Sequence, residues 1–168
     1  VSEQTFVKAF NELRPFLADT GKELTHFELL TAAAFCAFRA EHVDWAVIEV
    51  GIGGRLDATN VIEKPRVCVI TPISIDHVGF LGPDLKSIAA EKAGIIKPGC
   101  VVVCGRQSPG ALDVITERAA DVGAALLLQD RDFGVVERLL AVGGAQLTLK
   151  GLGGTYTDVA LPLFGAHQ

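Results

Sequence analysis

The sequence predicts an α/β fold, a mostly parallel doubly wound sheet flanked by helices, with a small antiparallel β appendage at its carboxyl end. Three observations support this prediction. Short apolar runs alternate with helical patterns as far as about residue 130. These runs are apolar throughout, which is typical of strands covered on both faces. Beyond Asp130 the helical patterns stop, and short strands are separated by glycine clusters.

Two helices are predicted at the start of the chain. Apolar residues from Gln4 to Ala18 recur at helical spacing, and Gly21 is a stop signal. Thr25 and Glu28 have the spacing of a capping box at the start of a second helix, which runs over 27–40. Because this helix is apolar on nearly all sides, we expect it to be buried.

Strands and helices then alternate along the chain. In chain order, the predicted elements are a strand over 44–49, a strand over 66–71, a helix over 85–93, a strand over 100–104, a helix over 109–122, a strand over 125–128, and three short strands over 133–137, 145–149 and 156–161. The last three strands are expected to form an antiparallel meander, and a loop is expected over 72–83.

Composition argues against several classes of protein. The 168 residues are 49% hydrophobic, which suits one compact domain, yet no apolar run approaches the ~18 residues of a membrane span. No signal peptide is visible. With a net charge of −5 and no basic stripe, we expect neither a membrane nor a nucleic acid as partner. The four cysteines lie in apolar runs without zinc-ligand spacing, as in cytoplasmic proteins.

Ionisable side chains follow two of the predicted strands. Glu49 ends the first strand and precedes the glycine-rich loop 51–54, while Asp76 and His77 lie in the loop after the second strand. In open α/β sheets, the carboxyl ends of the strands form the edge at which ligands bind. Glu49 is a suitable ligand for a hard cation. The alternatives are an ion pair with Arg55 and a loop carboxylate bonded to the backbone.

Lys92 lies on the predicted short helix between apolar neighbours. Two alanines precede the Glu91-Lys92 pair, and the apolar run 93–96 follows it. An enclosed lysine loses its charge readily, and its neutral amine can react. A solvated helix face is the alternative interpretation.

Four motifs occur in the order and at the spacing of a known family. They are Thr25-His-Phe-Glu28, Glu49-Val-Gly-Ile-Gly-Gly-Arg-Leu-Asp-Ala-Thr-Asn60, Ser74-Ile-Asp-His77 with Leu81-Gly-Pro83, and Ala90-Glu-Lys-Ala-Gly-Ile95. Together they resemble bacterial folylpolyglutamate synthase/dihydrofolate synthase, of the Mur ligase superfamily. The resemblance is dense over about residues 20–100, and it implies a fold of the Mur ligase central-domain type.

The resemblance also implies a domain organisation. Residues 1–130 would be part of the central ATPase domain, and residues 131–168 a small β-rich part of the same domain. The chain contains no Gly-x-x-x-x-Gly-Lys-Ser/Thr phosphate loop. We therefore expect that loop upstream of Val1 and expect the family's C-terminal glutamate-binding domain to be missing, so that the chain alone would be inactive.

The activity implied by the resemblance is ATP-dependent addition of L-glutamate to folates, to dihydropteroate, or to both. ATP would phosphorylate a carboxylate of the substrate, and the amine of glutamate would attack the acyl phosphate. Such chemistry depends on positioning and on neutralisation of phosphate charge, here by Mg²⁺. The partners would be small molecules, and the full-length protein is expected to be a monomer.

Residue roles follow from the matched motifs. By resemblance, Glu49 and His77 would bind Mg²⁺, with His77 also catalytic, and Lys92 matches a lysine that is carbamylated in the family. His167 and Gln168 match the start of a nucleotide-binding segment. The positions that hold the pterin in bifunctional members are matched by Thr25, Phe27, Asp57 and Ala58. Core packing for Phe27 and a loop turn for Asp57 are the alternatives.

Other interpretations stay open at this point. Another Mur-type ligase would share the fold, although the string Leu56–Asn60 favours the folate branch. A metallohydrolase could use Glu49, His77 and a carbamylated Lys92, but such sites usually need more histidines than the four in this chain. A non-catalytic module that binds folate or pteroate would fit the missing phosphate loop.

Overall fold

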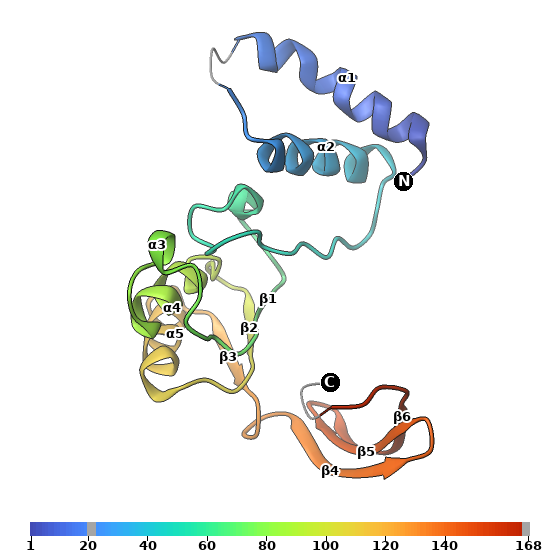
Figure 1. The fold of residues 1–168 in the computed structure, drawn as a ribbon, viewed down its shortest axis with the longest axis vertical. Helices are drawn as coiled ribbons and strands as arrows, with labels where there is room; N and C mark the ends of the chain where they lie inside the picture. The colour runs from blue at the N-terminus through green and yellow to red at the C-terminus, as the bar shows by residue number, and fades with distance from the viewer. Residues whose placement is uncertain (20–22, 166–168) are drawn as a thin grey trace. The chain divides into compact units, whose positions relative to one another are not determined.

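The structure, a computed structural model, describes residues 1–19 and 23–165 and is shown in Figure 1. The predicted helix stop at Gly21 and the predicted nucleotide-binding residues His167 and Gln168 lie outside the described residues. By its internal contacts the chain divides into two units, Val1–Ile62 and Glu63–Gln168.

The first unit begins with a pair of helices, as predicted. Helix α1 (Glu3–Asp19) packs against α2 (His26–Ala40) through a small core. Arg39 Nη2 lies 2.7 Å from Glu12 Oε2 and links the two helices. The core residues have short side chains at the contact: Ala9, Ala33 and Ala37 are buried, with Phe10, Leu13 and Cys36 packed around them.

Helix α2 is less buried than its composition predicts. Only Ala33 and Ala37 are buried, whereas Phe27 is 42% exposed. Within this unit, the neighbours of α2 are α1 and the short 3-10 helix η1 (Ala58–Val61). These neighbours cover one stripe of the helix, so the prediction of an all-round buried helix is wrong for the described residues.

The strand predicted over 44–49 is also absent from the described structure. This segment is extended, but it belongs to no sheet, and Trp45 and Val47 are 79% and 97% exposed. An apolar run becomes a strand only when a neighbouring strand pairs with its N–H and C=O groups. No described strand supplies that partner.

The second unit contains the predicted parallel sheet. Strands β1 (Val67–Ile70), β2 (Val101–Cys104) and β3 (Ala125–Leu128) pair in this order, all parallel. Helices α4 (Leu85–Ala93) and α5 (Pro109–Asp121) connect them, and their bounds agree with the predicted helices to within one residue. Parallel pairing of consecutive strands requires a crossover connection, which is usually a helix as it is here.

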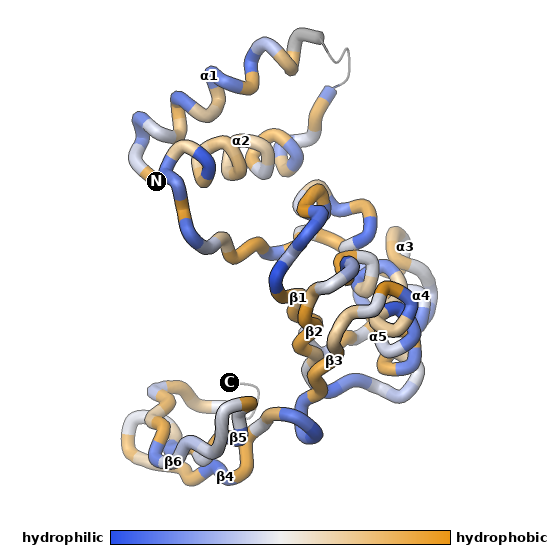
Figure 2. Tube along the Cα trace, turned by 180° about the vertical axis from the view of Figure 1, so that it is seen from behind, coloured by the Kyte–Doolittle hydropathy of each residue, from blue (hydrophilic) through white to orange (hydrophobic). Residues whose placement is uncertain are grey.

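Helices cover one face of this sheet. Figures 1 and 2 show α3, α4 and α5 on the same side of β1–β3. The core on that side consists of Cys68, Ile70, Ala93, Ile96, Cys100, Val102, Cys104 and Ile115. Three of the four cysteines are therefore buried, and burial, together with the neighbouring Cys100 thiol, raises the pKa of Cys68 to about 12. On the other face, Val67 and Val69 are 49% and 59% exposed.

The predicted antiparallel appendage is confirmed, with longer strands. Strands β4 (Gly134–Ala141), β5 (Gly144–Gly151) and β6 (Gly154–Leu161) form a meander with two-residue connections. Gly144 has φ +152°, and a Cβ there would lie 2.0 Å from the Leu161 carbonyl oxygen. This position therefore accepts only glycine, because the backbones of β5 and β6 meet where a side chain would be.

Two short helices were not predicted, the 3-10 helix η1 and the α-helix α3. Helix α3 (Val78–Leu81) lies within the segment 72–83 that the sequence predicts as a loop. Its single turn carries too few residues to show a period of 3.6, so no pattern could reveal it. Among the helices that the structure describes, none has the length and apolar character needed to cross a membrane.

Candidate functional site

The glycine-rich loop after Glu49 is organised around the carboxylate of Asp57. Asp57 Oδ2 accepts hydrogen bonds from the N–H groups of Gly51 and Ile52, both at 3.0 Å. Asp57 Oδ1 accepts from the N–H of Thr59 at 2.9 Å and from its hydroxyl at 2.6 Å. A carboxylate has about four acceptor positions. The chain's own donors therefore occupy all of them, as in the turn alternative.

These hydrogen bonds affect the pKa of the Asp57 carboxyl group. Partial burial raises the pKa of its carboxyl group, but hydrogen bonds from Thr59, Ile52 and Gly51 act in the opposite direction, and the net pKa lies below the usual value. The ionised group is thus favoured by the fold. Thr59, which donates twice, is the buried polar residue of this loop, at 7% exposure.

A pH dependence of the loop follows from this lowered pKa. The ionised carboxylate stabilises the fold fully above the unfolded pKa of about 3.9, and this contribution is lost as the pH falls through the lower folded value. We expect the amide NMR resonances of Gly51 and Ile52 to be constant from pH 7 to about pH 4 and to shift together below it. A shift centred between pH 5 and 6 would contradict the hydrogen-bond arrangement.

Phe27 contacts the same loop. A Cβ built on Gly51 would lie 2.7 Å from Phe27 Cζ and 3.1 Å from Asp57 Oδ2. The absence of a side chain at Gly51 therefore lets the aromatic ring and the carboxylate approach one backbone position. Since Phe27 is 42% exposed, part of its ring is free to contact a ligand. Phe27 and Asp57, two of the predicted pterin positions, are thus brought together within the first unit.

The other two predicted pterin positions have structural roles nearby. Thr25 is the N-cap of α2, and its hydroxyl accepts from the Glu28 N–H at 3.2 Å while Glu28 Oε2 accepts from the Thr25 N–H at 2.8 Å. The predicted capping box is confirmed. Ala58 is the first residue of η1 and follows its N-cap, Asp57.

Glu49 and His77 lie in different units of the chain. Glu49 is exposed in the extended segment that precedes the glycine loop. His77 is the N-cap of α3 and has a left-handed backbone, with φ 50°. Its N–H donates to Asp76 Oδ1 at 2.7 Å, and its Nε2 lies 3.6 Å from Asp76 Oδ2. A non-glycine residue with positive φ is uncommon and is often found at functional sites.

Lys92 lies in the last turn of α4. It is half-buried, and its neighbour Ala93 belongs to the core of the second unit. A positive charge at a helix carboxyl end is favoured by the helix dipole. The predicted enclosure of Lys92 is therefore partial.

A complete metal centre is not formed by side chains of the described residues. They contain no group of three or more His, Cys, Asp and Glu side chains arranged to hold an ion. The exposed Glu49 carboxylate and His77 imidazole could each supply one ligand. A carboxylate oxygen is a ligand that Mg²⁺ prefers, and Mg²⁺ usually takes only one or two protein ligands and completes its shell with phosphates and water.

One polar residue at the sheet edge, Gln107, is not among the site residues that the sequence predicts. The side chain of Gln107 bonds to the backbone at Thr71 and Ile73, in the segment that leads to His77. The signal that could have revealed it is its position, three residues beyond the end of β2. Polar residues at the carboxyl ends of parallel strands are candidates for a site.

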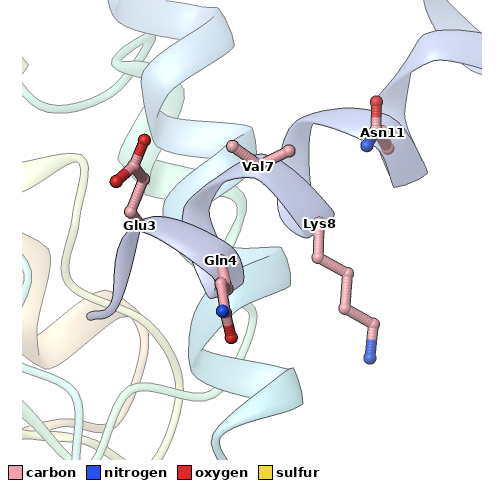
Figure 3. A pocket seen from close by; sticks show the side chains of 5 residues that line it. All are labelled: Glu3, Gln4, Val7, Lys8 and Asn11. Atoms are coloured by element: carbon pink, nitrogen blue, oxygen red, sulfur yellow. The ribbon is translucent and has the colours of Figure 1, made fainter.

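Two surface grooves contain none of the predicted site residues. The first, of about 390 Å³, runs along α1 and is lined by Glu3, Gln4, Val7, Lys8 and Asn11 (Figure 3). The second, of about 440 Å³, lies before β1 and β2 and is lined by Glu63, Lys64, Pro65, Arg66, Pro98 and Gly99. The motif-bearing loops, rather than these grooves, define the candidate site.

Known proteins resemble the whole of this chain. The dihydrofolate synthase/folylpolyglutamate synthase of Mycobacterium tuberculosis is 46% identical over 185 residues, covering 100% of the chain and 38% of that protein. A crystal structure of Mycobacterium tuberculosis folylpolyglutamate synthase complexed with ADP and AMPPCP is also similar, with 45% identity and a TM-score of 0.89. The match covers 99% of this chain and 40% of the chain in that structure.

A solved folylpolyglutamate synthase complex with AMPPCP and folate is also similar. It has 42% identity and a TM-score of 0.86, and it covers 96% of the chain and 39% of its own length. No protein-family model matches the chain. The α/β fold, the motif string and these similarities together show that the chain belongs to the folylpolyglutamate synthase/dihydrofolate synthase family. It spans about two fifths of the length of these relatives.

Proposed function

We propose that this chain is part of an ATP-dependent ligase that joins L-glutamate to a folate, to dihydropteroate, or to both. The observation that carries this proposal is the similarity along the whole chain to folylpolyglutamate synthases solved with ADP, AMPPCP and folate. AMPPCP is a non-hydrolysable analogue of ATP, which supports ATP as the co-substrate. In the proposed reaction, the γ-phosphoryl group of ATP passes to a carboxylate oxygen, and the glutamate amine then displaces phosphate to form the amide.

Glu49 and His77 are the residues that would hold Mg²⁺ in this ligase. When bound, the ion neutralises charge on the transferred phosphoryl group. The left-handed backbone at His77 and the adjacent Asp76 carboxylate restrict how the imidazole is presented. The exposed carboxylate of Glu49 precedes a loop that Asp57 holds by two amides.

Lys92 would act in its carbamylated form. Its neutral amine would form an N–C bond with carbon dioxide and release a proton, which turns a cation into an anionic oxygen ligand. The end of α4 stabilises the unmodified ammonium, because the helix dipole favours positive charge there. The carbamate would therefore depend on a nearby cation, as expected of a metal-binding site.

The pterin end of the substrate would be received by the first unit. The partly exposed ring of Phe27 offers an apolar surface for a flat heterocycle. Thr25 and Asp57 hold the helix start and the loop on either side of it, and Ala58 follows directly. His167 and Gln168 are proposed to begin the nucleotide-binding segment.

The wider organisation of the protein is part of this proposal. We assign residues 1–130 and 131–168 to a central ATPase domain and its small β-rich part, with the phosphate loop and the glutamate-binding domain supplied by other segments. We propose a monomer that works in the cytoplasm. The four free cysteines, three of them buried among apolar residues, support a reducing compartment.

The decisive measurement is phosphate release by the full-length ligase with ATP, Mg²⁺ and glutamate. Dihydropteroate and a reduced folate are supplied in separate reactions, and each is repeated without glutamate. We expect release that depends on glutamate with at least one of the two substrates. A folded protein that releases no phosphate with either would contradict the proposal and favour a different Mur-type substrate or a binding module.

A further inference from the structure

We propose that Gln107 is a positioning residue for His77, because its side-chain amide holds the backbone segment from which the His77 loop begins. This inference rests on the proposed function, in which His77 is a metal ligand. It concerns a residue outside the four motifs, and it follows from the way in which the pairing of β1 with β2 ends.

The ladder between β1 and β2 stops at a proline. The last paired residues are Ile70 and Cys104, and the N–H of Gly105 still donates to the Ile70 carbonyl at 2.8 Å. Pro72 lies two residues beyond Ile70 and has no N–H with which to continue the ladder. The backbone groups on either side of this proline therefore need other partners.

Gln107 supplies both partners. Its Nε2 donates to the carbonyl oxygen of Thr71 at 2.8 Å, and its Oε1 accepts from the N–H of Ile73 at 3.0 Å. A side-chain amide carries a donor and an acceptor, as a peptide group does, so Gln107 takes the place of one more strand residue. A Cβ on Gly105 would lie 3.1 Å from Pro72 Cδ, so this glycine lets the two loops approach.

Gln107 is itself held by the loop after β3. The N–H of its neighbour Arg106 donates to Gln129 Oε1 at 3.1 Å, and Arg106 Nη2 lies 3.0 Å from Asp130 Oδ1. On its other side, Ser108 is the N-cap of α5. The three loops at the carboxyl edge of the sheet are thus linked in series, and the amide of Gln107 is oriented before any ligand binds.

The link reaches His77 through a short exposed segment. Ile73 packs against the core, whereas residues 74–77 are exposed. His77 has no side-chain hydrogen bond that caps α3. Its placement is therefore set from two sides. On one side is α3, whose Leu81 is buried, and on the other is the point where the chain leaves the sheet at Thr71–Ile73, which Gln107 holds. Residues that do not touch the metal but orient one of its ligands typically contribute about 10–100-fold to metal affinity or activity.

The test compares two substitutions at Gln107 in the full-length ligase. Gln107→Leu keeps the approximate size of the side chain and removes both hydrogen bonds, while Gln107→Glu keeps only the acceptor for the Ile73 N–H. Gln146→Leu is the matched control, because Gln146 Nε2 also donates a side-chain hydrogen bond, to Asp158 Oδ1 at 2.8 Å, within the antiparallel sheet. Circular dichroism establishes that each variant is folded, and the Glu variant serves if the Leu variant is not.

Two quantities are measured. Hydrogen–deuterium exchange of residues 71–78, without nucleotide or metal, should be about tenfold faster in Gln107→Leu, which corresponds to the loss of about one hydrogen bond's net free energy. The Mg²⁺ concentration that half-saturates glutamate-dependent phosphate release should rise by about tenfold and turnover should recover at high Mg²⁺. Gln107→Glu should show a smaller change in both, and Gln146→Leu none.

Unchanged exchange over 71–78 in the Gln107 variants would overturn the proposal. So would faster exchange with an unchanged Mg²⁺ requirement, because Gln107 would then hold the segment without serving His77. A wild-type protein without any ligase turnover would instead contradict the proposed function. The exchange measurement needs neither substrate nor metal, so it would still decide whether Gln107 holds this segment.

Discussion

Replacing His77 by alanine in the full-length ligase is expected to lower glutamate-dependent phosphate release by a factor of about 100 or more. The imidazole is one of only two unmodified side chains proposed to bind Mg²⁺ directly, and loss of a group that merely orients a metal ligand already costs up to about 100-fold. Because His77 is 49% exposed and packs into no core cluster, the fold should remain intact. Turnover with both substrates and the thermal unfolding midpoint are the quantities to measure.

His42→Ala is the matched control for this substitution. His42 is likewise an exposed histidine with a left-handed backbone, at φ 51°. The cost of placing alanine at positive φ is therefore similar in both variants. We expect near-normal turnover for His42→Ala, and near-normal turnover for His77→Ala would rule out the metal role of His77.

Replacing Asp57 by alanine is expected to lower turnover on the order of 10–100-fold, with similar losses for dihydropteroate and for a reduced folate. The carboxylate holds the amides of Gly51 and Ile52, two and three residues beyond the proposed metal ligand Glu49. Its removal leaves these donors without their partner and releases the loop. Since Mg²⁺ is needed for either substrate, both reactions should suffer.

Thr59→Val distinguishes between two roles of Asp57, which are holding the loop and contacting the substrate directly. This variant removes the hydroxyl donor at 2.6 Å but leaves the Asp57 carboxylate in place, so a smaller and again parallel loss is expected. Asp113→Ala removes an exposed carboxylate from α5 and serves as control. If Asp57→Ala reduced turnover with dihydropteroate alone, the carboxylate would contact the pterin directly, contrary to the filled acceptor positions that the structure shows.

Local patterns were sufficient for the parallel sheet and for its two crossover helices, α4 and α5. The strands β1, β2 and β3 are short apolar runs bounded by proline, glycine or charged residues, and each has its pairing partner within the same unit. The helix α5 begins at Pro109 and is followed by Gly123 with φ +64°, as its start and stop signals predict. The capping box of Thr25 and Glu28 is equally local, because both partners lie within one turn.

Predictions failed where a residue's state depends on a distant partner. The run 44–49 has the composition of a strand, yet without a neighbouring strand it stays extended and exposed. Helix α2 has the composition of a buried helix, yet burial requires elements on every side. The composition of a segment shows which side chains could be buried. Whether they are buried depends on the elements that pack around the segment.

The site shows the same division. The sequence alone determined the family, through a motif string whose order and spacing are specific, and it identified Glu49, His77, Lys92, Phe27 and Asp57 as candidates. Tertiary structure decided which of them meet: Phe27 and Asp57 converge on Gly51, a position with no side chain of its own. It also decided that three backbone N–H groups and the Thr59 hydroxyl occupy the acceptor positions of the Asp57 carboxylate. Gln107 emerged only from the fold, because its partners lie more than 30 residues away along the chain. Such contacts depend on how strands are placed side by side, which no local pattern encodes.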